Sequence, residues 1–200
     1  RELFASYPDQ ALVMNISADK ENAVEFIAGL GSQINNQTKV EGDQIVINGQ
    51  APWHTDPNYT GVHPPVYKEG KGMRFEGRLL VKQEGGTISA QDDKLHVKDA
   101  ASATITFVAA TSFNGFDKDP AVNGRDEKAI CKKYLSSLET KKYPDLYKAH
   151  LADYSSLFGR VSIDLGESPE SNLPINQRIK NYKPSMDPAL TALYFQFGRY

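Results

Sequence analysis

Apolar and polar residues alternate along much of the first half of the chain. The alternation is clearest at residues 11–18, 44–48, 74–82 and 103–109. A period of two residues places every second side chain on the same face of an extended segment, so it predicts half-buried β-strands. Short sequences rich in Gly, Asp and Glu separate these segments, as turns do. Several short strands with turns between them predict an antiparallel β-sandwich or barrel that extends to about residue 111.

Two long segments without this alternation predict loops. Residues 50–72 are rich in Pro, Tyr and His, and residues 112–124 are rich in Gly, Asn and Asp. Long ordered loops often carry functional side chains. In the first loop Trp53 precedes His54, and this pair suits a sugar, because an indole stacks on C–H groups while ring nitrogens hydrogen-bond hydroxyl groups. The alternative is that both side chains only anchor the loop.

Helical periodicity replaces the alternation after residue 125. Residues 126–140 and 144–158 predict two helices. The second helix places His150 on its apolar face, where we expect a hydrogen-bonded packing histidine rather than a catalytic one. Cys131 lies in the first helix, with apolar residues three, four and seven positions further on, and is predicted to be a buried packing residue.

The rest of the chain predicts a short strand, a linker and one more helix. The strand is expected at residues 161–165, and the polar, proline-bounded residues 167–174 have the composition of a linker. Asp187 fits the N-cap of the last helix, and Pro188 fits its first position. This helix carries an apolar stripe made of Leu190, Leu193, Tyr194 and Phe197.

These elements divide the chain into three parts. We expect a β-sandwich domain at residues 1–124, a helical linker with a short strand at 125–174, and the start of a further domain at 175–200. We expect the last helix to continue to the end of the sequence, without a capping Gly or Pro. Burying each large residue of the apolar stripe is worth roughly 1.5–3 kcal/mol. We therefore expect further helices of a longer polypeptide to cover it.

Composition excludes several classes of function. The chain has 200 residues, of which 40% are hydrophobic and 24% are charged, as in soluble globular proteins. Its net charge is −2 and its basic residues are scattered, so it lacks the basic footprint that nucleic acid binding needs. No apolar run approaches the roughly 20 residues that span a bilayer. The single cysteine excludes an internal disulfide.

Catalytic chemistry has no local signature in this sequence. The close spacing of a metal site is absent among the four histidines, His54, His63, His96 and His150. A glycosidase generally needs two groups that flank one bond, and the carboxylates here are scattered over predicted turns and helix surfaces. The residue pattern by itself therefore does not identify an enzyme.

Six stretches, in order along the chain, resemble glycoside hydrolase family 95. They are RELFASYPDQ (1–10), GQAP (49–52), GMRFE (72–76), AATSFNGF (109–116), the helix that includes HLADYSSLF (150–158), and DPAL through LYFQFGRY (187–200). The resemblance implies a mainly β chain with a helical C-terminal part: an antiparallel β-super-sandwich whose start lies upstream, a helical linker, and the first helix of an (α/α)6 barrel.

The resemblance also implies an activity. Family members are exo-acting hydrolases that release terminal α-L-fucose, and some prefer α-L-galactose. They act with inversion: a Glu general acid protonates the leaving oxygen, while asparagines assisted by an Asp activate water. They use neither a metal nor an organic cofactor. These catalytic residues belong to barrel segments beyond Tyr200, so we expect none in this chain. Implied partners are a fucosylated oligosaccharide or plant or host glycan and the rest of the same polypeptide. The implied location is periplasmic or secreted, in a bacterium.

The candidate residues at the edge of the substrate site are Trp53, His54, Phe113 and Asn114, which we select for their loop positions and their sugar-binding chemistry. Two other classes of function remain open. The chain has the pattern of a non-catalytic carbohydrate-binding β-sandwich with a helical appendage, or of a structural assembly domain with no role in glycan recognition.

Overall fold

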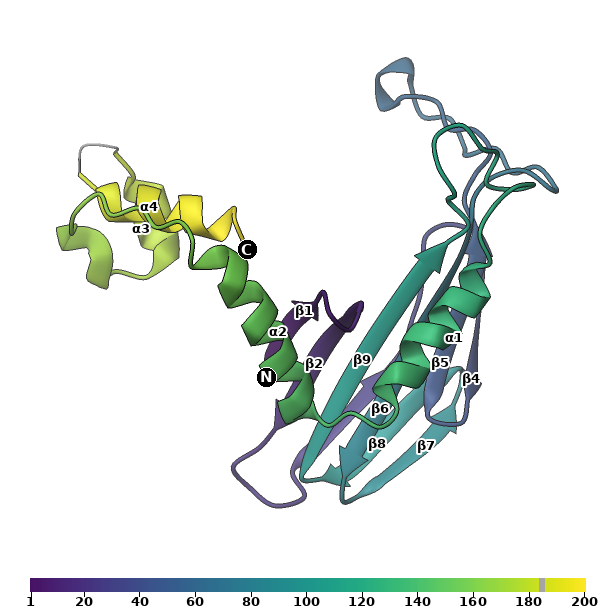
Figure 1. Ribbon diagram of the computed structural model, residues 1–200, viewed down its shortest axis with the longest axis horizontal. Coiled ribbons are helices and arrows are strands. Elements are labelled where there is room, and N and C mark those ends of the chain that lie inside the picture. Colours follow the sequence, from purple (N-terminus) through teal and green to yellow (C-terminus); the bar gives the residue numbers. More distant parts are fainter. Residues whose placement is uncertain (184–185) are drawn as a thin grey trace. The chain divides into compact units, whose positions relative to one another are not determined.

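The computed structural model describes residues 1–183 and 186–200, and these form two compact units (Figure 1). The first unit is Arg1–His150 and contains all the strands. The second unit is Leu151–Tyr200 and is helical. The prediction of a mainly β chain with a helical C-terminal part is confirmed. The division of the sequence at residues 124 and 174 stays a prediction.

The strands of the first unit form two antiparallel sheets. The larger has six strands in the order β1 (Glu2–Ser6), β2 (Ala11–Ser17), β9 (Ser102–Thr111), β6 (Arg74–Glu84), β5 (Gln44–Gln50) and β4 (Asn36–Glu41). The smaller has three strands in the order β3 (Val24–Ala28), β8 (Lys94–Ala100) and β7 (Thr87–Gln91).

The two sheets pack against each other as a β-sandwich. Their shared core contains Ile45, Leu79 and Val81 from the large sheet, together with Leu95 and Val97 from the small sheet. These side chains are all buried, because alternate residues of each strand point toward the opposite sheet. The alternation seen in the sequence is therefore the pattern of a sandwich core.

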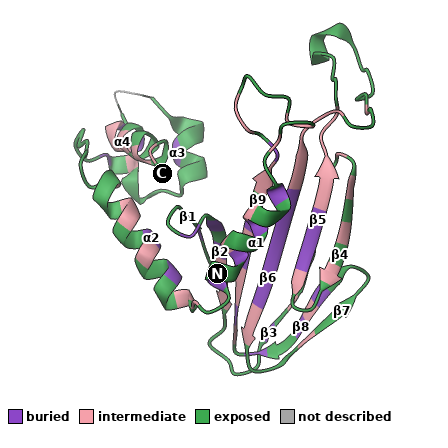
Figure 2. Cartoon of the chain, turned by 45° about the vertical axis from the view of Figure 1, so that its right-hand side comes forward, coloured by how far each residue is buried: buried purple, intermediate pink, exposed green. Residues whose placement is uncertain are grey.

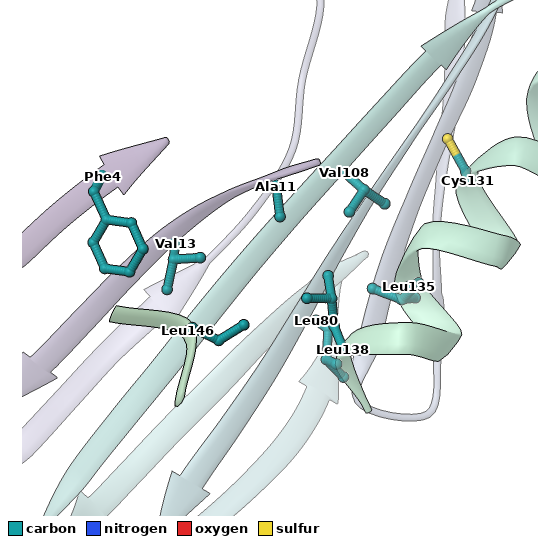
Figure 3. Close-up of a cluster of buried hydrophobic side chains, with 9 residues drawn as sticks. All are labelled: Phe4, Ala11, Val13, Leu80, Val108, Cys131, Leu135, Leu138 and Leu146. Carbon is teal, nitrogen blue, oxygen red and sulfur yellow. The ribbon is translucent and has the colours of Figure 1, made fainter. Parts of the chain in front are cut away.

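Helix α1 (Glu127–Leu138) packs on the other face of the large sheet, over β6 and β9. Its N-cap is Asp126, whose carboxylate accepts a hydrogen bond from the backbone N–H of Ala129 at 2.9 Å. Figure 3 shows Leu135 and Leu138 of this helix beside Leu80 of β6. The first turns of α2 (Tyr143–Phe158) add a buried leucine to the same core, so the large sheet has apolar contacts on both faces.

Charged side chains are buried on the helix-facing side of β6. The Arg78 guanidinium donates to Glu76 Oε1 at 2.7 Å, and both residues are buried. Lys82 lies four residues after Arg78 on the same face of β6 and donates to the carbonyl oxygens of Leu138 and Glu139. It thereby satisfies acceptors that the end of α1 leaves without helical partners.

Two predicted packing residues have the predicted environment. Cys131 is fully buried, and its Sγ donates to the carbonyl oxygen of Glu76 at 3.2 Å. His150 is buried as well, and its ring stacks on Phe4 with 4.6 Å between the ring centres. Both therefore stabilise the β unit through packing.

The second unit contains the end of α2, a 3-10 turn at Pro169–Asn172, α3 (Ile175–Asn181) and α4 (Pro188–Phe197). Asp187 is the N-cap of α4 and Pro188 opens this helix, as the sequence predicts. The helix ends at Phe197 with Gly198 as its C-cap, so the expectation of a last helix without a capping Gly is wrong. The Asp187 carboxylate accepts from the backbone N–H of Leu190 at 3.0 Å and binds the Arg178 guanidinium at 2.8 and 3.0 Å. This ion pair ties α3 to the start of α4.

The prediction of a strand at residues 161–165 is wrong. This segment has no regular secondary structure, and no strand pairs with it within residues 1–183 and 186–200. The carbonyl oxygen of Val161 instead accepts a hydrogen bond from the Arg199 guanidinium at 2.7 Å. An apolar run forms a strand only where a neighbour supplies a ladder of hydrogen bonds.

In the described parts of the chain, no helix is long and apolar enough to cross a membrane.

Candidate functional site

Two loops leave the large sheet at the same edge. Loop 51–73 joins β5 to β6, and loop 112–126 joins β9 to α1. Gln50 is opposite Arg74 in the register, and Phe75 is opposite Thr111, so both loops begin beside the first residues of β6. Figure 1 shows them together beyond the upper ends of these strands.

Arg74 connects the loops to the sheet. Its backbone N–H donates to Ser112 Oγ at 2.9 Å, and its carbonyl accepts from the Ser112 N–H at 2.9 Å. Its guanidinium donates to the buried Glu127 carboxylate at 3.3 Å and to the carbonyl of Ala121 at 2.8 Å. One side chain thus holds loop 112–126 and the first turn of α1 in place.

A surface ion pair also links the two loops. Lys71 Nζ lies 3.6 Å from the carboxylate of Asp119. The pKa of Asp119 lies below its ordinary value, chiefly because the Ala121 N–H donates to its carboxylate, with Lys71 adding to the effect. A pair this exposed contributes little to stability, so we assign it an orienting role only.

Trp53 and His54 lie on a short antiparallel bridge within loop 51–73. Val66 accepts from the Trp53 N–H at 2.9 Å and donates to the His54 carbonyl at 2.9 Å. The Trp53 side chain is about half exposed, at 54%, and Lys68 Nζ lies 5.4 Å from its ring centre. His54 Nε2 lies 3.0 Å from the Asp56 carboxylate. The bridge therefore presents an indole and an oriented imidazole to solvent.

Phe113 and Asn114 begin the second loop. Phe113 is exposed, and the Asn114 side chain donates to the carbonyl of Asn123 at 2.9 Å. Asn114 thus braces the loop from within, while Phe113 offers an aromatic surface. The structure places both predicted pairs of site residues on loops of one sheet edge. The contacts found for each pair lie within its own loop.

The buried carboxylates are already committed to ion pairs. In the described residues these are Asp9, Glu76, Glu127 and Asp187, and they pair respectively with Lys141, Arg78, Arg74 and Arg178. A carboxyl group that acts as a general acid has to reach the substrate. These four groups are buried and are paired with cations, so they have the character of structural ion pairs.

A polar groove beside these loops was not anticipated from the sequence. It has a volume of about 700 Å³ and lies between β4, β5 and the first turn of α1. It is lined by Asn35, Asn36, Gln37, Asn48, Gly49, Gln50, Arg74, Phe75 and residues 124–128. The sequence contained one signal for this groove. Amide residues stand two apart on each side of a turn, at positions 35 and 37 and at positions 48 and 50. This signal was missed because no strand was predicted at residues 36–41.

Comparison with known families assigns both parts of the chain. Residues 1–115 match the family model described as Glycosyl hydrolase family 65, N-terminal domain. Residues 142–200 match the model described as Glycosyl hydrolase family 95 catalytic domain. A β-sandwich followed by residues that match a glycosidase catalytic domain assigns the chain to the glycoside hydrolase families.

Curated relatives specify the family further. The chain is 31% identical to Alpha-L-fucosidase 2 from Arabidopsis thaliana over 214 aligned positions, which cover all of this chain and 25% of the relative. It is 24% identical over 218 positions to Probable alpha-fucosidase A from Aspergillus niger, again with 25% of that relative covered. The corresponding protein of Aspergillus oryzae is 29% identical over 147 positions. The chain belongs to glycoside hydrolase family 95, and it spans about a quarter of the length of the first two relatives.

Proposed function

We propose that this chain is part of an exo-acting glycoside hydrolase that releases terminal α-L-fucose from glycans. The observation that carries this proposal is the similarity of the whole chain to proteins named as α-fucosidases, together with the match to a family 95 catalytic domain. Both are independent of any single residue.

The reaction that we propose inverts the configuration at the anomeric carbon, with the proton donor and the groups that activate water supplied by segments outside this chain. The ion pairing of the four buried carboxylates described above supports this assignment. A terminal α-L-galactoside is the alternative substrate, and the glycan is of plant or host origin. We propose a periplasmic or secreted location.

The role that we propose for the two loops is to contribute side chains to the edge of the substrate site in the complete enzyme. Trp53 and Phe113 each present an exposed aromatic ring, which can stack on the apolar C–H face of a sugar. His54 and Asn114 supply nitrogens that hydrogen-bond hydroxyl groups, in addition to the contacts that they already make.

Turnover of two aryl glycosides by the complete enzyme tests the activity. We expect hydrolysis of an aryl α-L-fucoside, with slower hydrolysis of the α-L-galactoside, and we expect β-L-fucose as the first anomer in proton NMR spectra. The 200-residue chain alone should hydrolyse neither substrate. Release of α-L-fucose first would contradict inversion. Absence of turnover by the complete enzyme, or turnover by the chain alone, would contradict the proposed division of roles.

A further inference from the structure

The floor of the polar groove is a set of four amides that the sheet register brings together. Gln37 of β4 is the partner of Asn48 of β5. Two residues away, the Gln50 N–H donates to the carbonyl of Asn35 at 3.1 Å, which continues the same pairing. Residues two apart on a strand share a face. The four amide side chains therefore lie on the face of the sheet that also carries Arg74, the partner of Gln50.

Most of these amides are available to a ligand. Within residues 1–183 and 186–200, the side chains of Asn35, Gln37 and Asn48 make no hydrogen bond, and Gln50 donates one, to the carbonyl of Lys68 at 3.3 Å. Each amide has two donor hydrogens and an acceptor oxygen. The floor of the groove therefore presents both hydrogen-bond donors and acceptors. A ligand group that both donates and accepts, such as a hydroxyl group, can bind to such a floor.

Neighbouring elements shape the groove. Figure 2 shows α1 beside β6 and β9, while no helix lies over β4 and β5 in that view. The first turn of α1 forms a wall, and the bond from Arg74 to Glu127 holds this turn against the sheet. A Cβ atom on Gly49 would lie 2.2 Å from the carbonyl oxygen of Asn35. Glycine at this position therefore permits the close approach of the two strands that carry the amides.

The lining distinguishes between classes of ligand. A protein interface has an apolar centre, and Phe75 is the one large apolar side chain among the lining residues. A nucleic acid needs several cations along its path, whereas the wall offers Arg125 and Lys128 beside Asp126. Several amides and a few charged groups can donate hydrogen bonds to the hydroxyl groups of a sugar chain and accept hydrogen bonds from them. A volume of about 700 Å³ is within the range of ligand-binding clefts, about 300–1,000 Å³.

We propose that this groove binds an oligosaccharide, namely internal sugar residues of the glycan whose terminal fucose the enzyme removes. The identity of the glycan rests on the proposed function, whereas the binding of sugar by the groove rests on the four amides. The amides of Asn48 and Gln37 form the centre of the site, because these residues are paired across the two strands and, in the described part of the chain, neither side chain makes a hydrogen bond.

Direct binding to the complete enzyme tests the groove. An array of fucose-free oligosaccharides, neutral and uronic acid-containing, identifies a bound structure, which is then titrated calorimetrically. We expect Asn48→Ala and Gln37→Ala each to weaken binding about tenfold, equivalent to about 1.4 kcal/mol. Gln91→Ala is the matched control, because this exposed amide at the end of β7 lies outside the groove and should leave the affinity unchanged.

The outcomes separate the two proposals. Binding by the native enzyme that both substitutions weaken supports the groove, whether or not an aryl α-L-fucoside is hydrolysed. Absence of binding to every oligosaccharide, or equal affinity in all variants, overturns it. Thermal unfolding of each variant controls for folding. If Asn48→Ala fails to fold, Gln37→Ala decides the question, because Gln37 is exposed on an edge strand.

Discussion

Cys131 shows how the surroundings of one residue determine its chemistry. It lies in the middle of α1, against the large sheet, and its thiol has no exposed surface. Burial raises the pKa of the thiol to about 11, and the negative charge of Glu76 acts in the same direction. The reactive form of a cysteine is the thiolate. The environment therefore makes Cys131 an inert packing residue.

Cys131 should be protected from thiol reagents in the native protein. At pH 8 we expect negligible reaction with Ellman's reagent without denaturant and one equivalent in urea. Because the pKa is higher in the folded state than the ordinary value near 9, this thiol stabilises the fold fully below pH 9 and progressively less up to about pH 11. Rapid labelling of the native protein at pH 8 would show that the thiol is accessible.

Trp53 is the side chain on which the proposed role of loop 51–73 can be tested. In the complete enzyme, Trp53→Ala should raise KM several-fold, since a lost stacking contact is worth roughly 0.5–1.5 kcal/mol. His54→Ala should raise KM as well. Tyr59→Ala is the control, because Tyr59 is an aromatic residue of the same loop that is 85% exposed. Unchanged KM and kcat in the Trp53 and His54 variants would contradict a role in substrate binding and would indicate that both side chains only anchor the loop.

At the scale of elements, short polar contacts determine where helices begin and end. Asp126 and Asp187 each cap the first turn of a helix, and Lys82 satisfies the last carbonyl groups of α1. The carboxylate of Asp187 also forms an ion pair with Arg178 of α3. The pKa of Asp187 is lowered to about 2, first by the hydrogen bond from Arg178 and also by that from the Leu190 N–H.

The stability of the α3–α4 pair should depend on the ionisation of Asp187. Because the folded pKa lies below the ordinary value of 3.8, this stabilisation is complete above about pH 4 and is lost as the pH falls toward about 2. Asp187→Ala should lower the thermal midpoint at pH 7. The difference between native protein and variant, measured by circular dichroism, should shrink between pH 4 and pH 2. A difference independent of pH would exclude the charge as its source.

At the scale of the whole molecule, the helical unit presents a large apolar surface. A groove of about 750 Å³ lies between α3 and α4. It is lined by Ile175, Ile179, Tyr182, Leu190, Thr191, Leu193, Tyr194 and Phe197. Leu190 is buried, but Tyr194 and Phe197 are about three-quarters exposed, at 76% and 75%. Soluble proteins rarely leave such a surface open. We propose that further helices of a longer polypeptide cover it.

The apolar surface should make the 200-residue chain associate with itself. We expect its sedimentation coefficient to rise with concentration. The double substitution Tyr194→Glu and Phe197→Glu should reduce that rise, because it places charge on the exposed part of the groove. Val122→Glu is the control, since Val122 is an exposed apolar residue of loop 112–126. Equal association of all three proteins would place the contact elsewhere.

Patterns confined to one segment were predicted well. The strands containing residues 11–17 and 74–82, the cap at Asp187, and the burial of Cys131 follow from local periodicity and side-chain chemistry. The two loops with the candidate residues were also located. The strand expected at residues 161–165 was wrong, since strand formation depends on a partner that the segment itself does not contain.

The sequence by itself determined the strands with clear alternation, the helices α1, α2 and α4, the N-cap of α4, and the apolar faces of these elements, because each of these depends on neighbours a few residues apart. Only the tertiary structure decided which residues meet across the sheet. The pairing of Gln50 with Arg74, and of Arg74 with Glu127 of α1, depends on strand register and on the packing of α1. These contacts join segments far apart in the chain, and no local pattern encodes them.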